Sequence, residues 1–340
     1  MTLPSPLHIT TLLPLDLDTS IEIQKYKKAI EEIIQGTSSL WALVVGPCSL
    51  HDTQSALEYA KKLQNLQKKV QKTCLLIMRA HIEKPRTCLG WKGFLYDPLL
   101  DGSNNLSKGL FMSRNLLLQI AQLGIPIATE FLDPLASPYF SDLVSWGFIG
   151  ARTSSSQIHR QLASFLPMPI GFKNSTDGNL DNAIYGALSS QNSHSFIHIN
   201  TLGEICEVKS SGNPFSHIVL RGSRKAPNYT PCDIQIALKK SSECGLTHRL
   251  LIDCAHNNSP KKPFDQKNVC NSALEQYLSG NDRIMGIMLE SHLKAGNQSI
   301  DSAFIDPYIS VTDPCIDWEE TEELICLIHE ALSESSLLCC

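Results

Sequence analysis

Residues 41–79 read WALVVGPCSLHDTQSALEYAKKLQNLQKKVQKTCLLIMR, and this stretch decides the fold. It holds a short apolar run at Leu43–Pro47, an amphipathic stretch at Ser55–Lys69 and a second apolar run at Leu75–Arg79. A strand, a helix and another strand in this order predict two parallel neighbours in one sheet. The same alternation continues along the chain, so a parallel α/β architecture is expected throughout.

The chain contains eight apolar runs with this rhythm. Most are dense in Val, Ile or Leu, as expected of strands that are buried on both faces. Helical stretches fill the gaps, for example Leu110–Leu123, Asp181–Ser190 and Pro231–Cys244. Eight such units in 340 residues predict a single TIM (β/α)8 barrel. The predicted strands are Leu43–Pro47, Leu75–Arg79, Ile125–Glu130, Phe148–Arg152, Pro169–Lys173, His217–Arg221, Leu250–Asp253 and Ile284–Glu290.

Three segments are expected outside the barrel core, which should occupy residues 41–330. Residues 1–40 should form an N-terminal arm and a helix, with N-caps at Asp18-Thr19-Ser20 and an end at Gly36. Phe196–Thr201 and Ile205–Lys209 flank a short turn and predict a β-hairpin inserted before the sixth strand. Residues 331–340 should form a C-terminal tail that ends in Cys339-Cys340.

The bulk composition is that of an ordinary globular protein, with 42% hydrophobic and 19% charged residues. A net charge of −5 argues against binding to nucleic acid or to an anionic membrane surface. No apolar stretch approaches the roughly 20 residues that cross a bilayer, and no basic region of a signal peptide precedes the first apolar residues. The 12 cysteines are scattered without zinc-site spacing, so reduced thiols and a cytoplasmic location are expected.

Polar, mostly ionisable residues stand at the C-terminal end of every predicted strand. One such charge is readily explained as a structural ion pair. In a closed barrel, however, all these ends face one mouth, where barrel enzymes place their chemistry. The residues are Cys48, Arg79, Glu130, Arg152, Lys173, Arg221, Asp253 with His256, and Glu290.

Four of these residues are cationic: Arg79, Arg152, Lys173 and Arg221. Lys84-Pro85-Arg86 adds two more cations just beyond the second strand. Guanidinium groups bind phosphate and carboxylate through two parallel hydrogen bonds, and lysine adds a point charge. The cluster therefore predicts a ligand that carries several negative charges.

A second subset, Cys48, His256, Glu290 and Asp313, offers a thiolate, an imidazole and two carboxylates. Such donors suit one divalent ion of Mn, Fe, Co or Zn. The four residues are far apart in the sequence, so their spacing does not establish a metal site. It is also consistent with His256 as a hydrogen-bonded structural histidine and with Cys48 as a small buried hydrophobic side chain. Their shared position at one end of the barrel is what favours a metal site.

Nine motifs in the chain resemble those of the class I (microbial type) 3-deoxy-D-arabino-heptulosonate 7-phosphate (DAHP) synthases. They occur in the order and at the spacing of that family between Trp41 and Trp318. The motifs are Val45-Gly46-Pro47-Cys48-Ser49, Met78-Arg79, Glu83-Lys84-Pro85-Arg86-Thr87, Gly90-Trp91-Lys92-Gly93, Gly150-Ala151-Arg152-Thr153, Gly171-Phe172-Lys173-Asn174, Leu220-Arg221-Gly222, Asp253-Cys254-Ala255-His256-Asn257-Asn258-Ser259 and Glu290-Ser291-His292.

The resemblance implies the condensation of phosphoenolpyruvate with erythrose 4-phosphate, the first step of the shikimate pathway to aromatic amino acids. It implies a divalent metal bound by Cys48, His256, Glu290 and Asp313. Cys48 and His256 would be catalytic residues because they hold this metal. Phosphoenolpyruvate would bind to Arg79, Arg152, Lys173 and Arg221. Erythrose 4-phosphate would contact Lys84, Pro85, Arg86 and Thr87. Glu130 and Lys173 are the candidates for handling the attacking water and its protons.

Three other functions remain as alternatives. A 3-deoxy-D-manno-octulosonate 8-phosphate synthase would carry Lys-Ala-Asn-Arg where this chain has Lys84-Pro85-Arg86-Thr87. A Schiff-base aldolase would use Lys173 as its nucleophile, which would leave the metal ligands and arginines surplus. A non-catalytic regulatory homologue would be expected to lack a ligand or an arginine, and none is missing.

Two segments depart from the family's pattern: Asn200-Thr201-Leu202-Gly203, and Pro134 through Pro138. In relatives these regions and the N-terminal arm help form the inhibitor pocket and the subunit contacts. The resemblance implies a homo-oligomer, a dimer or a tetramer. It also implies regulation by an aromatic amino acid, but these departures leave open whether this chain is inhibited and by which amino acid.

Overall fold

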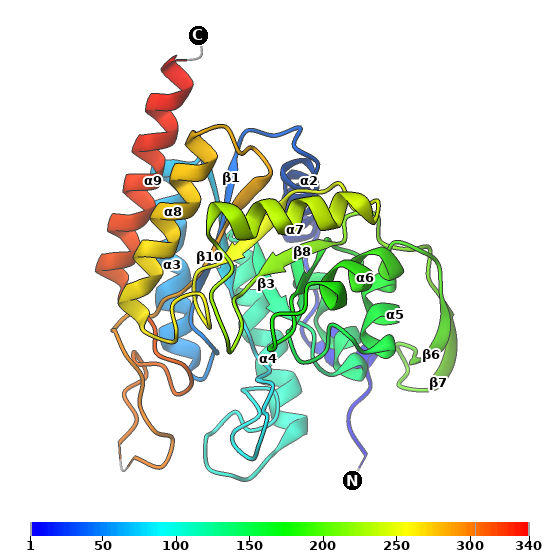
Figure 1. Cartoon of the computed structure of the whole chain (residues 1–340). Coiled ribbons are helices and arrows are strands. Elements are labelled where there is room, and N and C mark those ends of the chain that lie inside the picture. The colour runs from blue at the N-terminus through cyan, green and yellow to red at the C-terminus, as the bar shows by residue number, and fades with distance from the viewer. Residues whose placement is uncertain (1, 303, 339–340) are drawn as a thin grey trace.

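A closed barrel of eight parallel strands forms the centre of the computed structural model, which describes residues 2–302 and 304–338 (Figure 1). Around the barrel the strands follow the order β1-β2-β3-β4-β5-β8-β9-β10, and β10 pairs with β1. The predicted (β/α)8 barrel is therefore confirmed. The strands are β1 (Trp41–Gly46), β2 (Cys74–Arg79), β3 (Ile127–Glu130), β4 (Trp146–Ile149), β5 (Ile170–Lys173), β8 (His217–Leu220), β9 (Leu250–Asp253) and β10 (Ile284–Glu290).

Seven of the eight strands are followed by an α-helix on the outside of the barrel. The exception follows β3, where two short 3-10 helices, η1 (Pro134–Tyr139) and η2 (Ser141–Leu143), make the connection. Pro138 inside η1 lacks the amide hydrogen that a regular helix needs. The outer helices are α3 (Thr53–Val70), α4 (Leu106–Gln122), α5 (Gln157–Phe165), α6 (Asp181–Ser190), α7 (Pro231–Glu243), α8 (Gln266–Leu278) and α9 (Trp318–Leu338).

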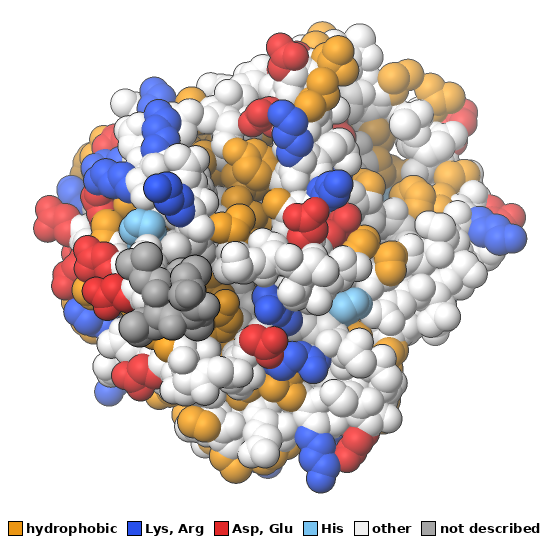
Figure 2. Space-filling view, turned by 90° about the horizontal axis from the view of Figure 1, so that it is seen from above, with side chains coloured by type: hydrophobic (Ala, Val, Ile, Leu, Met, Phe, Trp, Pro, Cys, Tyr) orange, Lys and Arg blue, Asp and Glu red, His pale blue; other side chains and the backbone are white. Residues whose placement is uncertain are grey.

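The inside of the barrel is filled at one end and open to loops at the other. Helix α2 (Leu17–Gln35) places Ile30, Ile33 and Ile34, all fully buried, in one cluster with strand residues such as Val44. Each such isoleucine contributes about 1.5–3 kcal/mol by leaving water. Helix α2 lies at the top of Figure 1, whereas the loops that follow β2 and β10 hang below the barrel. Figure 2 views the molecule from above and shows basic and acidic side chains interspersed on that face.

Segments at the two ends of the chain differ from expectation. Residues before β1 contain α1 (Pro6–Leu12) as well as α2, which begins at Leu17 because the Asp16 side chain caps it. Gly36 ends α2 in a left-handed conformation, as predicted. The expected tail at residues 331–340 is wrong over residues 331–338, because α9 continues to Leu338 and buries Leu332. Cys339-Cys340 lies outside the described residues.

The inserted hairpin is confirmed as an antiparallel pair, β6 (Ser195–Ile199) and β7 (Ile205–Lys209), between β5 and β8. The fourth barrel strand ends at Ile149, so Arg152 lies in the turn behind the strand rather than in it. Of the helices within the described residues, none combines the length and the apolar character that a membrane crossing requires.

Candidate active site

A cavity of about 310 Å³ lies among the loops at the C-terminal ends of the barrel strands. It collects most of the residues that the sequence indicated, from six strand ends and from the loop before α9. Those that line it are Arg79, Lys84, Pro85, Arg86, Thr87, Glu130, Arg152, Lys173, Arg221, His256 and Asp313. Cys48 and Glu290 are buried and touch this lining, Cys48 through Lys84 and Glu290 through Arg79 and His256.

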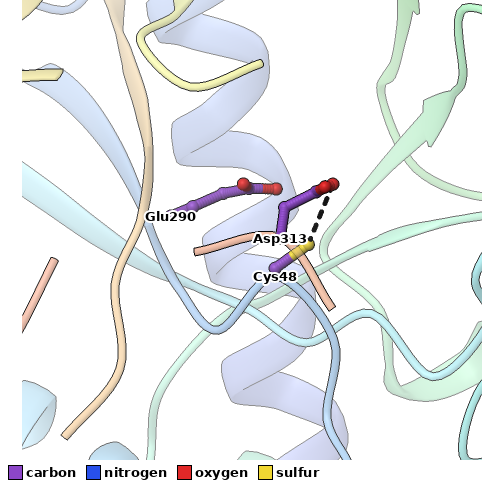
Figure 3. Close-up of side chains that lie close together, drawn as sticks. All are labelled: Cys48, Glu290 and Asp313. Carbon is purple, nitrogen blue, oxygen red and sulfur yellow. Dashed lines mark hydrogen bonds between the residues drawn. The ribbon is translucent and has the colours of Figure 1, made fainter. Parts of the chain in front are cut away.

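Three potential metal donors converge beside the cavity (Figure 3). The Cys48 sulfur and one carboxylate oxygen each of Glu290 and Asp313 all lie within 4.8 Å of one another. They come from the loop after β1, the end of β10 and the loop before α9. The Lys84 ammonium lies among them, with Nζ 2.7 Å from Cys48 Sγ and 3.1 Å from Asp313 Oδ2. A cation thus already occupies the neighbourhood of two of the three donors.

The charges of this group depend on one another. Burial raises the pKa of the Cys48 thiol, and Glu290 adds to that rise while Lys84 opposes it. Burial also acts to raise the pKa of Asp313, but Lys84 and Lys261 more than offset it, so the carboxyl pKa falls below its usual range. A positive charge placed at this point therefore stabilises the ionised forms of both donors.

His256 is adjacent to this group but is not part of it. Its Nε2 lies 3.6 Å from Glu290 Oε1, and its Nδ1 lies 2.9 Å from Asp253 Oδ2. The same Asp253 oxygen accepts a hydrogen bond of 2.7 Å from Lys173 Nζ. Metal-binding histidines commonly present one ring nitrogen to a carboxylate in this way, which leaves the other nitrogen for the ion.

Arg79 and Glu290 form a buried ion pair, with 2.9 Å between Nη2 and Oε1. They stand on β2 and β10, the two neighbours of β1, and Gly46 at the end of β1 pairs with Glu290. A Cβ at Gly46 would lie 2.4 Å from the Arg79 carbonyl oxygen, so a glycine is required there. Burial acts to raise the pKa of Glu290, but His256 and Arg79 outweigh it and the pKa is lowered.

Three arginines that line the cavity are held by uncharged polar groups rather than by carboxylates. Arg221 Nη1 donates to Asn257 Oδ1 at 2.7 Å, and Arg152 Nε donates to Thr87 Oγ1 at 3.0 Å. Arg86 Nε donates to the Trp91 carbonyl at 2.8 Å. These contacts leave other guanidinium N–H groups for an anionic ligand.

Glu130 lines the same cavity as these arginines and is only 7% exposed. Its carboxylate lies against Gly150, where a Cβ would be 2.0 Å from Oε1. Position 150 must therefore be glycine if the Glu130 carboxylate is to keep its position.

The site also contains residues that the sequence did not predict, among them Asp253, His81 and Lys261. Asp253 ends a predicted strand, but the sequence indicates no role for it, although it joins Lys173 to His256. His81 lines the cavity, and burial followed by Arg79 and Lys173 holds its pKa well below the usual value. Its position just after β2 was a usable signal. Lys261, which contacts Asp313 Oδ1 at 2.8 Å, carried no signal because it lies in a loop.

Comparison with known proteins agrees with this geometry. A family model described as the DAHP synthetase I family matches residues 18–325. The chain belongs to the DAHP synthetase I family. A family member from Escherichia coli, named phospho-2-dehydro-3-deoxyheptonate aldolase, Tyr-sensitive, is 43% identical over 97% of this chain and 93% of its own length.

Two further relatives extend the comparison. A Trp-sensitive phospho-2-dehydro-3-deoxyheptonate aldolase from Enterobacter agglomerans is 43% identical over 90% of this chain and 88% of its own length. The solved structure of the phospho-2-dehydro-3-deoxyheptonate aldolase from Francisella tularensis superposes with a TM-score of 0.96 at 40% identity, covering 98% of this chain and 97% of that one. The DAHP synthetase I fold is thus matched over nearly the whole chain.

Proposed function

We propose that this chain is a metal-dependent DAHP synthase, a transferase that converts phosphoenolpyruvate, erythrose 4-phosphate and water to DAHP and inorganic phosphate. The observation that carries the proposal is one cavity that joins a metal-donor group to several cations, in a chain of the DAHP synthetase I family. Both substrates are anionic, which suits the lining. The new carbon–carbon bond joins the enolic carbon of phosphoenolpyruvate to the aldehyde carbon, and the C–O bond to phosphate breaks after water adds.

The metal would be held by Cys48, Glu290 and Asp313, with His256 as fourth ligand through Nε2. The donor set fits a divalent ion of Mn, Fe, Co or Zn, because thiolate, imidazole and carboxylate are its usual ligands. The Lys84 ammonium between Cys48 and Asp313 supports the fit, since it marks a position where positive charge is favoured. When bound, the ion supplies a Lewis acid that polarises the aldehyde of erythrose 4-phosphate.

The cations position the two substrates and offset their mutual repulsion. We assign the phosphate and carboxylate of phosphoenolpyruvate to Arg79, Arg152, Lys173 and Arg221. The Lys84-Pro85-Arg86-Thr87 loop then receives the phosphate of the sugar. Arg152 donates to Thr87, so the two subsites share a boundary at that contact.

Glu130 and Lys173 are assigned to the water and its protons. Glu130 is a carboxylate of the cavity lining that is not among the proposed metal donors, and Lys173 reaches the cavity from the end of β5. A carboxylate can accept a proton from the attacking water, and an ammonium can donate one to the leaving phosphate.

The ion pair of Lys173 argues against the Schiff-base alternative. Its ammonium lies 2.7 Å from the fully buried Asp253 carboxylate, and a charged ammonium has no free electron pair with which to attack a carbonyl. Borohydride should therefore trap no substrate on this chain. The octulosonate-phosphate alternative predicts turnover with arabinose 5-phosphate instead of erythrose 4-phosphate.

We also propose that an aromatic amino acid regulates the enzyme. A cavity of about 500 Å³ lies between the N-terminal arm, η1 and the hairpin, and its lining includes Leu95, Leu110, Tyr96 and Asp133. The aliphatic side chains could cover an aromatic ring, and the Asp133 carboxylate could pair with the ammonium group. Inhibition by phenylalanine, tyrosine and tryptophan, each added separately, tests this. A homo-oligomer, a dimer or a tetramer, is proposed with it, and light scattering during gel filtration would measure the mass.

The decisive assay measures phosphate release from phosphoenolpyruvate with either sugar phosphate, before and after chelation. We expect release with erythrose 4-phosphate, loss of release after EDTA and recovery with Mn²⁺. Release that survives exhaustive chelation, or that requires arabinose 5-phosphate, would refute the proposal.

A further inference from the structure

Asparagine side chains fill the space behind three neighbouring strand ends, those of β5, β8 and β9. Asn174 follows Lys173 at the end of β5 and is fully buried. Its Oδ1 accepts a hydrogen bond from Arg221 N at 2.9 Å, and its Nδ2 donates to the Gly222 carbonyl at 2.9 Å. One amide thus holds the backbone of the two residues that directly follow β8.

Asn228, from the loop between β8 and α7, links this amide to the rest of the group. Its Oδ1 accepts from Gly222 N at 2.7 Å, and its Nδ2 donates to Asn174 Oδ1 at 3.1 Å. Its own backbone N–H donates to Asn258 Oδ1 at 2.8 Å. Asn228 therefore connects the end of β8 with both neighbouring strand ends.

Asn258 completes the group on the side of β9. It is 3% exposed, and its Nδ2 donates to the Asp253 carbonyl at 2.9 Å and to the Leu220 carbonyl at 3.3 Å. The backbone at Gly222 packs tightly against the same loop, since a Cβ there would lie 2.5 Å from the Asn257 carbonyl carbon. Gly222 also has φ +73°, which a residue with a side chain rarely adopts.

We infer that Asn228 is a positioning residue that fixes the backbone at Arg221 and Gly222 and thereby aims the Arg221 guanidinium into the cavity. Arg221 is only 6% exposed, so a shift of its backbone cannot be absorbed by swinging the side chain into solvent. Asn257 holds the guanidinium from the β9 side through the 2.7 Å contact with Nη1. The inference rests on the proposed function, in which Arg221 binds phosphoenolpyruvate.

Two variants test this role separately from the stability of the fold. Asn228→Ala leaves the buried Gly222 N–H without its acceptor. Asn257→Ala removes only the contact to the guanidinium, at a side chain that is partly exposed. Asn192→Ala is the control, because Asn192 is exposed and its amide bonds only within its own helical turn. The dissociation constant of phosphoenolpyruvate is measured by calorimetry on Mn²⁺-loaded protein, and the KM of erythrose 4-phosphate by phosphate release.

We expect phosphoenolpyruvate to bind about tenfold more weakly to Asn228→Ala and about threefold more weakly to Asn257→Ala, as for one lost hydrogen bond. The KM of erythrose 4-phosphate should stay within about twofold, because its proposed contacts come from the loop after β2. A purely structural role would reduce the folded fraction and leave the dissociation constant unchanged.

An unchanged dissociation constant in folded Asn228→Ala would overturn the inference, and so would equal losses for both substrates. If Asn228→Ala does not fold, Asn228→Asp is measured in its place, because it keeps an oxygen that accepts from Gly222 N and loses the N–H that donates to Asn174 Oδ1. An unchanged dissociation constant in that variant also overturns the inference. Wild-type protein that fails to bind phosphoenolpyruvate would refute the proposed function instead.

Discussion

Replacement of Asp253 by asparagine removes one charge that two residues of the site, Lys173 and His256, share. Its carboxylate is fully buried and lies 2.7 Å from Lys173 Nζ and 2.9 Å from His256 Nδ1. Burial alone would raise the pKa of Asp253, yet His256 and Lys173 hold it well below its usual value. Asp253→Asn keeps the shape of the side chain but removes the charge that both partners require.

The expected destabilisation follows from the unpaired charge that the substitution leaves buried. Lys173 is 3% exposed, so the variant leaves a buried ammonium without its counter-charge, which typically destabilises a fold by about 3–5 kcal/mol. Urea unfolding should show a loss within that range. Phosphate release per folded molecule should fall at least about 100-fold, because Lys173 and His256 both lose their orientation.

Asp142→Asn is the matched control for this experiment. Asp142 also pairs with a buried cation, Arg114, at 2.7 Å, but Asp142 lies in η2 and Arg114 in α4, and neither residue lines the cavity. Its loss should lower stability by less, because its side chain is 40% exposed, and should leave the turnover of folded molecules unchanged. The reasoning is refuted if Asp253→Asn turns over within threefold of wild type, or if Asp142→Asn loses as much activity.

Three further changes have defined outcomes. Cys48→Ala should release no phosphate and should lack the near-ultraviolet thiolate-to-metal band of the Co²⁺-loaded protein, and wild-type-like turnover with added Mn²⁺ would contradict the ligand set. Gly150→Ala should lower kcat about tenfold or more with intact metal binding, because the new Cβ would lie 2.0 Å from Glu130 Oε1, and unchanged kinetics would count against a role for that carboxylate. Burial lowers the pKa of His217 to about 3, whereas its pKa in the unfolded chain is near 6.5. The neutral imidazole therefore contributes its full share to the free energy of unfolding above pH 6.5. Between pH 6.5 and pH 3 this share falls by about 1.4 kcal/mol for each unit of decreasing pH. Urea titrations should show a shallower slope for His217→Gln than for wild type or for the exposed His8→Gln, and parallel curves would contradict the assignment.

The gathering of the strand-end residues was predictable because the parallel strands of a closed barrel all end at the same rim. Each apolar run closes on or just before a polar residue, and closure of the barrel brings those residues together without further information. Arg152 was misplaced in a strand because the apolar run does not mark where β4 stops pairing, at Ile149. Asp313 lies outside every strand, so no strand end indicated it, and the family resemblance strengthened its place among the candidate ligands.

What the sequence could not give is the pairing among the gathered residues. Asp253 serves Lys173 and His256 at once, and Lys84 lies between Cys48 and Asp313. Such contacts depend on side-chain directions that are set only when the barrel has closed. Asparagines such as Asn228 carry no charge and stand in loops, so composition and periodicity give no reason to single them out.

The central claim is that one rim of the barrel holds the metal beside the phosphoenolpyruvate cations. Anomalous diffraction at the Mn edge, from crystals soaked with Mn²⁺ and phosphoenolpyruvate, tests it most directly. We predict one Mn peak within bonding distance of Cys48 Sγ and of the Glu290 and Asp313 carboxylates, with phosphoenolpyruvate on Arg79 and Arg221. A Mn peak elsewhere, or phosphoenolpyruvate bound away from these arginines, would contradict the account.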